Sequence, residues 1–212
     1  MNYICHSGGC PGADMEWERE GEKYGVKTIA YSFHNHVQEG KNPKILTVDE
    51  LAEGWFHVKL ADKNLQKNVE SLDSPYMRNL LCRNWFQVKN AEAVFAISNG
   101  FLTKDTVKGG TGWAVQMAVD CDKPVFVFYQ DAMGGGWFRY MPIVGFESLR
   151  GEIPRLSENF DVINFAGIGT RDINEYGRDA IKRVYHETFT VSYNEKMKDS
   201  GFRKLSLYER IR

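Results

Sequence analysis

Residues 6–26 read HSGGCPGADMEWEREGEKYGV, a glycine-rich bend followed by a helical pattern. The apolar run YIC precedes the bend, and a second run, VKTIAY, begins at Val26. Short apolar runs of this kind are typical of buried strands. The stretch therefore predicts a strand, a tight turn from Ser7 to Asp14, a helix and a second strand. Glycine at the turn permits positive φ and lets a ligand approach the backbone closely.

The same alternation continues along the chain. Further buried strands are predicted at AVFAI from Ala93, PVFVFY from Pro124 and VINFAGI from Val162. Thr47 is expected to cap the second helix. Alternating strands and helices indicate a parallel sheet covered on both faces, so we predict an α/β, Rossmann-like doubly wound sheet. The helical patterns cover residues 13–24, 48–69, 76–91, 112–121 and 173–189.

The chain shows no interdomain linker and no repeat, so residues 1–189 are predicted to form a single Rossmann-like nucleotide-binding domain. Residues 190–212 are charged and are expected to form a C-terminal arm. Two segments are longer than a simple alternation of strands and helices requires. Residues 34–90 are too long for one crossover, and the glycine-rich, aromatic residues 131–160 are expected to form a hairpin, a lid or a long surface excursion.

Composition excludes several classes of protein. With 212 residues, 42% hydrophobic and 13% aromatic, the chain is globular rather than disordered. A net charge of −1 gives no basic field for nucleic acid. No apolar run approaches the ~20 residues that span a membrane. Because no secretory leader follows Met1 and the four cysteines form no CxxC pair, a cytoplasmic protein is expected. No metal site and no required cofactor are expected.

Two more glycine turns resemble the first. KGGTG, residues 108–112, directly precedes a helix, and GIGTR, residues 167–171, follows a strand. Helix N-termini favour phosphate, and ligands of parallel sheets bind beyond the carboxyl ends of the strands. The turns match neither the P-loop nor the dinucleotide fingerprint. We expect one nucleotide-like phosphorylated ligand in a shared crevice. The expected ligand-binding residues are Ser7, Gly8, Gly9, Gly12, Ala13, Asp14, Lys108, Gly109, Gly110, Thr111, Gly112, Gln116, Gly167, Gly169, Thr170 and Arg171.

A few side chains are candidates for chemistry. Arg83 would fork onto a phosphate or a ribose, the alternative being a surface salt bridge. Asp14 is either a base or ribose-hydroxyl acceptor, or a plain helix cap. Cys10 stands at a helix start, but the sequence places no histidine beside it. The aromatic residues at 137, 138 and 140 would stack on a base or pack in the core.

Residues 83–116 resemble the LOG phosphoribohydrolases of the SLOG superfamily, which also contains DprA. Arg83 stands nine residues before Glu92, and KGGTGWAVQ is similar to the LOG motif PGGxGTxxE. The resemblance implies cleavage of the N-glycosidic bond of a nucleoside monophosphate, with Arg83 and the motif's final glutamate as catalytic residues, and a homo-oligomer. In an enzyme of this kind we expect Arg83 and Asp14 to be the catalytic residues of this chain. Gln116 replaces the motif's glutamate, however, and glutamine cannot transfer a proton. Binding without turnover is therefore the first expectation, and LOG-like hydrolysis is the alternative.

The units GIGTRDINEYG and SGGCPGAD resemble two units of DprA in reversed order. A circularly permuted LOG/DprA-like fold is therefore predicted, with the strand at residues 162–166 inside the sheet, parallel to and beside the N-terminal strand. The turn SGGxxGAD is also similar to that of molybdenum-cofactor carriers, so a carrier of a phosphorylated cofactor is a third hypothesis. SPYxxNLLxRN and GGTGWAVQMA are shared with a bacterial and phage family, a resemblance that implies no activity.

Two expectations concern the crevice itself. Gly9, Gly110 and Gly169 are expected at the same end of the sheet, around one pocket. Gln116 follows Gly112 by one helical turn, so its side chain is expected to point toward the pocket mouth.

Overall fold

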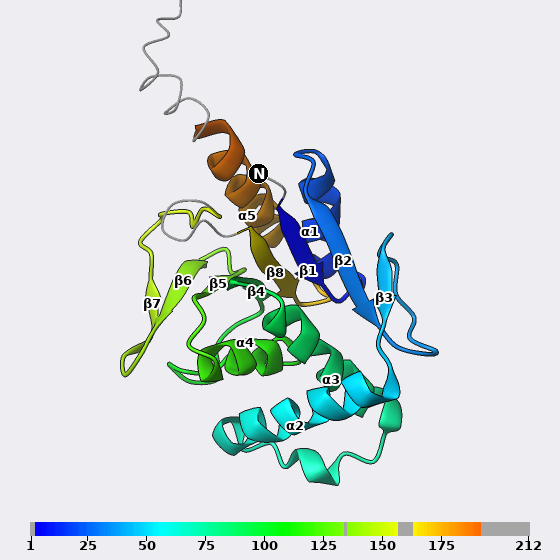
Figure 1. The fold of residues 1–212 in the computed structure, drawn as a ribbon. Helices are drawn as coiled ribbons and strands as arrows, with labels where there is room; N and C mark the ends of the chain where they lie inside the picture. Colours follow the sequence, from blue (N-terminus) through cyan, green and yellow to red (C-terminus); the bar gives the residue numbers. More distant parts are fainter. Residues whose placement is uncertain (1–2, 134, 157–162, 192–212) are drawn as a thin grey trace, which may run out of the picture.

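The computed structural model describes residues 3–133, 135–156 and 163–191, which form one eight-stranded sheet with helices on both faces (Figure 1). The C-terminal arm predicted at 190–212 lies almost entirely outside these residues. The strands are β1 (Ile4–Ser7), β2 (Lys27–Ser32), β3 (Pro43–Ile45), β4 (Ala93–Ser98), β5 (Val125–Tyr129), β6 (Gly136–Met141), β7 (Gly145–Ser148) and β8 (Asn164–Gly169). The helices are α1 (Ala13–Glu22), α2 (Val48–Leu65), α3 (Pro75–Lys89), α4 (Thr111–Asp120) and α5 (Glu175–His186), with short helical turns at Val69–Ser71 and Glu187–Val191.

The strand order is β3-β2-β1-β8-β4-β5-β6-β7. The first six strands in this order pair in parallel, whereas β6 pairs antiparallel with both β5 and β7 and so runs opposite to the other described strands. The α/β prediction with a mostly parallel, Rossmann-like sheet is therefore confirmed. β8 lies in the interior, parallel to both β1 and β4, as the sequence predicted for residues 162–166. A circular permutation as the origin of this order stays a prediction.

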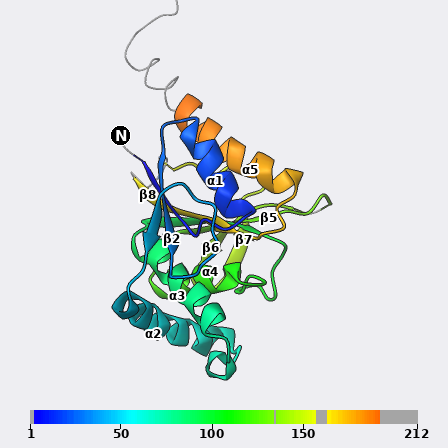
Figure 2. The ribbon, with the colours of Figure 1, turned by 90° about the vertical axis from the view of Figure 1, so that its right-hand side faces the viewer.

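The helices form two layers against the sheet and one beyond it. Helices α1 and α5 pack together on one face, and α3 and α4 cover the other (Figure 2). Every residue of β4 is buried, as expected for a strand covered on both faces. On the α1 face, Trp17 is fully buried and makes edge contacts with Phe95, Phe165 and Tyr185. This aromatic cluster fixes α1, and with it the turn that follows β1.

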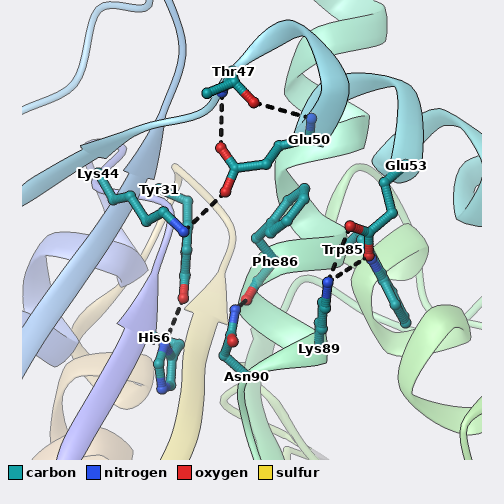
Figure 3. Close-up of polar contacts among 10 residues, drawn as sticks. All are labelled: His6, Tyr31, Lys44, Thr47, Glu50, Glu53, Trp85, Phe86, Lys89 and Asn90. Atoms are coloured by element: carbon teal, nitrogen blue, oxygen red, sulfur yellow. Dashed lines mark hydrogen bonds and ion pairs between the residues drawn. The ribbon is translucent and has the colours of Figure 1, made fainter.

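Helix α2 packs outside α3 and α4 rather than on the sheet. Thr47 caps α2 through a capping box with Glu50, so the predicted cap is confirmed. Figure 3 shows the polar contacts that join α2 to its neighbours: the Glu53 carboxylate accepts from the Trp85 indole at 2.7 Å and from Lys89 at 2.7 Å, and Glu50 pairs with Lys44 of β3. The contacts of Glu53 fix α3 from the side that faces α2.

The two segments that exceeded the minimal alternation have separate structures. Residues 34–90 contain β3, α2 and α3, so they form more than one crossover. Residues 131–160 contain the antiparallel hairpin β6–β7, the first of the three forms expected. Trp137 of this hairpin packs against Phe95 and Phe128 in the core. Phe138 and Tyr140 are half-buried and contact Phe101 and Phe146, respectively. Across the described residues, no helix is long and apolar enough to cross a membrane.

Candidate functional site

A pocket of about 460 Å³ opens where β1, β8 and β4 end. Parallel strands bring their carboxyl ends to one edge, which is where doubly wound sheets bind ligands. The turn after β1 supplies Cys10 and Asp14, and the end of β4 supplies Ser98 and Asn99. One side of α3 forms a wall. The remaining border comes from residues 108–111 before α4 and residues 169–172 after β8.

The pocket brings together residues from all three glycine turns. Gly110 and Gly169 border it, whereas Gly9 does not, although its neighbour Cys10 does. Gly9 instead faces Ala30 and Gln38, on the side of β2. The expected site residues that line the pocket are Asp14, Arg83, Lys108, Gly109, Gly110, Thr111, Gly169, Thr170 and Arg171. Those that do not are Ser7, Gly8, Gly9, Gly12, Ala13, Gly112, Gln116 and Gly167.

Several of the glycines outside the pocket allow close packing. A Cβ on Gly12 would lie 2.4 Å from the Arg171 carbonyl oxygen, and one on Gly112 would lie 2.2 Å from that of Val107. A Cβ on Gly167 would lie 2.7 Å from the Trp17 ring. These contacts are too short for any side chain, so the fold itself requires glycine at these positions.

The first turn is closed by internal hydrogen bonds. The Ala13 N–H, at the start of α1, donates to the Thr170 carbonyl at 3.0 Å. The Ser7 hydroxyl accepts from the Gly9 N–H at 3.3 Å. The Ala13 N–H is thus used to join the first turn to the turn after β8, and the Gly9 N–H is used within the first turn. A Cβ on Gly8 would lie 2.7 Å from the Arg83 guanidinium carbon, so no ligand enters there either.

The turn before α4 is open. No side chain caps α4 in the described structure, and its N-cap is Gly110. A Cβ on Gly109 or Gly110 would meet no described atom within 4 Å. Lys108 and Thr111 border the same space. An uncapped helix start beside open space and a lysine attracts an anion.

Gln116 points away from the pocket. Its side-chain amide donates to the Asp120 carboxylate at 2.8 Å, one helical turn toward the end of α4. The expectation that Gln116 faces the pocket mouth is therefore wrong. A residue one turn past Gly112 lies on the side of α4 that packs within the protein, where Gln116 is 7% exposed.

Asp14 is a buried carboxyl in the lining of the pocket. Its Oδ2 accepts from the Cys10 N–H at 3.3 Å, and the N–H groups of Gly8 and Gly169 also contact the carboxylate. Burial raises the pKa of Asp14, while the charge of Arg83 and the N–H donors oppose that rise. The arrangement holds the turns after β1 and β8 against each other.

Arg83 and Gln87 are two buried polar side chains that each keep one unpartnered donor. Arg83 is 7% exposed and Gln87 is 2% exposed, and both line the cavity from α3. One terminal nitrogen of Arg83 donates to the Gly8 carbonyl, which fixes the guanidinium. Arg83 Nε and Gln87 Nε2 have no hydrogen-bond partner among the described residues. Buried donors without partners are costly, so an acceptor that reached either nitrogen would be bound favourably.

Two further features were missed in the sequence. His36, in the loop after β2, lies with its Nε2 3.7 Å from Cys10 Sγ and 3.3 Å from Arg83 Nη1. No sequence pattern links residues 10 and 36. Gln87 had a usable signal, because it follows Arg83 by one helical turn and so shares its face.

Within the described ranges, no group of three or more histidine, cysteine, aspartate or glutamate residues is placed to hold a metal ion. Comparisons of the chain with protein-family models, with curated proteins and with solved structures found no match. The site is therefore interpreted through its own geometry.

Proposed function

We propose that the pocket binds a nucleotide or nucleotide-like phosphorylated ligand. The observation that carries the proposal is a pair of buried side chains that line the cavity from α3, Arg83 and Gln87, each with one donor nitrogen that has no hydrogen-bond partner among the described residues. Phosphate oxygens satisfy such donors, and a guanidinium matches them in geometry as well as charge.

The open turn before α4 provides a second set of contacts for the phosphate. Gly109 and Gly110 leave space at the helix start, and Lys108 and Thr111 stand beside it. Arg171 borders the pocket from the turn after β8. A phosphate between these groups would meet positive charge from three separate elements.

The α3 wall suits the remainder of a nucleotide. Tyr76, Met77, Leu80 and Leu81 line the pocket, and Tyr76 and Met77 are 38% and 45% exposed. Aromatic and apolar side chains beside polar groups are typical of sites for an organic ligand with a charged end. A volume of about 460 Å³ lies in the range of small-molecule sites. We therefore assign the base to the α3 wall.

Two observations favour binding over LOG-like hydrolysis. Gln116, at the position of the LOG glutamate, contacts Asp120 and not the pocket. Asp14 accepts hydrogen bonds from backbone N–H groups of the turns, so its carboxylate is already engaged. Gln116 is therefore not placed to stabilise a developing positive charge on a ribose. A site of this kind holds its ligand without accelerating bond cleavage.

The test begins with native extraction of the purified protein and mass spectrometry of whatever co-purifies. A molybdenum-containing molecule would instead support the cofactor-carrier hypothesis. Calorimetric titration with AMP and with inorganic phosphate then compares two variants of α3. Arg83→Gln should weaken AMP binding about tenfold or more, because a charge-assisted contact is lost.

The matched control is Arg78→Gln, on the same helix. The Arg78 guanidinium donates to the Leu72 carbonyl at 2.6 Å and lies over the Trp55 ring, outside the pocket. Its replacement should leave AMP affinity unchanged. Equal affinity of the wild type and Arg83→Gln for AMP would contradict the proposed function, as would efficient release of base from AMP by the wild type.

A further inference from the structure

The ends of β4, β5 and β8 meet at one edge of the pocket, and a polar side chain follows each of them. Asn99 follows β4, Gln130 follows β5 and Thr170 follows β8. Asn99 is exposed and Thr170 is half-buried, and both line the pocket. Gln130 is only 7% exposed and does not line it. The hydrogen bonds among these three side chains determine which atoms of Asn99 and Thr170 are left for a ligand.

Two backbone groups fix the orientation of the Gln130 amide. Its Oε1 accepts from the Asn174 N–H at 3.0 Å, and its Nε2 donates to the Asp172 carbonyl at 2.7 Å. Because a backbone N–H only donates and a carbonyl only accepts, the two ends of this amide cannot be exchanged. The other hydrogen of Nε2 is donated to the side-chain oxygen of Asn99. Asn99 therefore turns its oxygen to Gln130 and its nitrogen away from it.

The Thr170 hydroxyl is left as a donor. Its oxygen accepts from Asn99 Nδ2 at 3.1 Å and from the Asp172 N–H at 3.2 Å. These two bonds occupy both lone pairs of the hydroxyl, so its own hydrogen is the group that it offers to a ligand. Asn99 Nδ2 carries two hydrogens and gives one to Thr170, so the second is also left. Two donors thus lie on atoms 3.1 Å apart in the lining of the pocket.

Basic side chains border the same edge. Lys108 runs past the end of β4, because its Cδ and Cε lie 3.7 and 3.8 Å from the position of a Cβ on Gly100. The Lys108 N–H donates to the Gly100 carbonyl at 3.0 Å, so the open turn before α4 starts beside Asn99. Arg171 directly follows Thr170 and lines the pocket. The charged side chains among the described lining residues are three basic and two acidic: Arg83, Lys108, Arg171, Asp14 and Asp172. Two donors beside two cations match a group that accepts hydrogen bonds and carries negative charge.

We infer that Asn99 and Thr170 form the subsite for the phosphate group of the ligand, and that Gln130 is a positioning residue that keeps the Asn99 nitrogen turned toward it. The inference rests on the proposed function for the class of ligand. It goes beyond that function by assigning the contacts that recognise the phosphate oxygens. The Asn99 N–H and the Thr170 O–H donate to one phosphate oxygen or to two neighbouring ones. An ammonium group, which has only hydrogens to give, finds no acceptor on the Thr170 hydroxyl.

Asn99→Asp tests the subsite with almost no change of shape. The new carboxylate still accepts from Gln130, and the Thr170 hydroxyl can donate to it, but the donor for the ligand is replaced by a negative charge. Calorimetric titration at neutral pH should show AMP affinity lowered about tenfold or more. Adenosine lacks the phosphate, so its affinity should change by less than about twofold. Unchanged AMP affinity, or an equal fall for AMP and adenosine, would overturn the inference.

Asn64→Asp is the matched control. Asn64 is exposed in the last turn of α2, and its amide also donates to a side-chain oxygen, that of Asp120 at 2.9 Å. The substitution adds the same charge and removes the same kind of donor outside the pocket, so AMP affinity should stay at the wild-type value. A fall as large as that of Asn99→Asp would indicate a general effect of charge and count against the subsite.

Gln130→Glu tests the positioning role. A carboxylate cannot donate, so the Asn99 amide must turn its nitrogen to the new side chain and its oxygen to the pocket. AMP affinity should fall about tenfold while adenosine affinity stays nearly constant, a difference that a merely structural role would not produce. Should this variant fail to fold by circular dichroism, two variants of Thr170 decide. Thr170→Ser keeps the hydroxyl and should bind AMP about fivefold more tightly than Thr170→Val, and equal affinities of the two would contradict the subsite.

Inorganic phosphate separates this inference from the proposed function. Phosphate binding that Asn99→Asp abolishes, in a protein that does not bind AMP, upholds the subsite and counts against a nucleotide. AMP binding that Arg83→Gln weakens and Asn99→Asp leaves unchanged upholds the proposed function and overturns the subsite. A wild-type protein that binds neither phosphate nor AMP overturns both.

Discussion

At the scale of single residues, His36 carries a consequence for stability. Burial first, and then the charges of Arg83 and Arg171, lower the pKa of His36 to about 4 from an ordinary 6.5. As the pH falls below 6.5, His36 becomes protonated in the unfolded chain but stays neutral in the folded protein. The contribution of neutral His36 to stability is therefore complete above pH 6.5 and is lost as the pH falls toward 4.

We accordingly expect the free energy of unfolding of the wild type to fall more steeply between pH 6.5 and pH 4 than that of His36→Gln. Urea unfolding followed by tryptophan fluorescence measures it. The exposed His34, two residues away, supplies the control, and His34→Gln should follow the wild type. Parallel curves for the wild type and His36→Gln would contradict the burial of a neutral imidazole at this place.

Gln116 gives a second prediction. Its amide donates to Asp120, so Gln116→Glu would set two carboxylates one turn apart and remove a hydrogen bond. We expect a loss of about 1–2 kcal/mol of stability and no release of base from AMP. Thermal unfolding and chromatography of the nucleotide measure the two effects. Gln116→Met keeps the volume without the second charge and should cost less; base release by Gln116→Glu would restore the LOG-like mechanism.

The roles of individual glycines could not be predicted from the sequence. Gly110 and Gly112 belong to the same motif, but their surroundings differ. A Cβ on Gly110 would meet no described atom within 4 Å, whereas a Cβ on Gly112 would lie 2.2 Å from the Val107 carbonyl oxygen. The motif alone cannot separate these roles, because they depend on what lies across the turn. Arg83 was found from its type and position, whereas His36 reaches Cys10 only through tertiary structure.

At the scale of elements, the predicted strands and helices are all present, because each is specified by a local pattern. The five apolar runs became β1, β2, β4, β5 and β8, and the five helical patterns became α1 to α5. Strand β3 was missed, since its three residues are exposed and carry no apolar run. The position of α2 outside α3 was also not predictable, because it depends on helix-to-helix contacts such as Gly54 against Cys82.

The start of α4 supports a prediction about one element. Gly110 has ordinary helical φ and ψ of −65° and −34°, and a Cβ there meets no described atom within 4 Å. Gly110→Val should therefore fold, yet its side chain would fill the space that we assign to the phosphate. AMP affinity measured by calorimetry should fall about tenfold or more, with a melting temperature close to that of the wild type. Undiminished affinity would show that no phosphate binds at this turn.

At the scale of the whole molecule, the sheet order explains why three separated turns share one pocket. β8 enters between β1 and β4, so the turn after it meets the turns of both neighbours. The sequence anticipated this neighbour relation through the reversed order of two units. It could not anticipate the pairing of β8 with β4, which rests on contacts between residues about 70 positions apart.

The same order predicts a gradient of backbone protection. β1, β8 and β4 each have a strand on both sides and a helix layer on both faces, while β3 and β7 lie at the edges. Native-state hydrogen exchange should therefore be slowest in the three central strands and fastest in the edge strands. Mass spectrometry of peptic peptides resolves these segments. Exchange in β8 as fast as in β7 would contradict its interior place.

The interior position of β8 also has a consequence in time. A ribosome makes the chain from its N-terminus at roughly 5–20 residues per second. β1 and β4 are therefore complete several seconds before their common neighbour is synthesised. Until then the edges of β1 and β4 that will pair with β8 remain unpaired. The hydrogen bond between the turn after β1 and the turn after β8 also cannot form yet. During this interval a direct pairing of β1 with β4 is the mispairing that the order of synthesis leaves open.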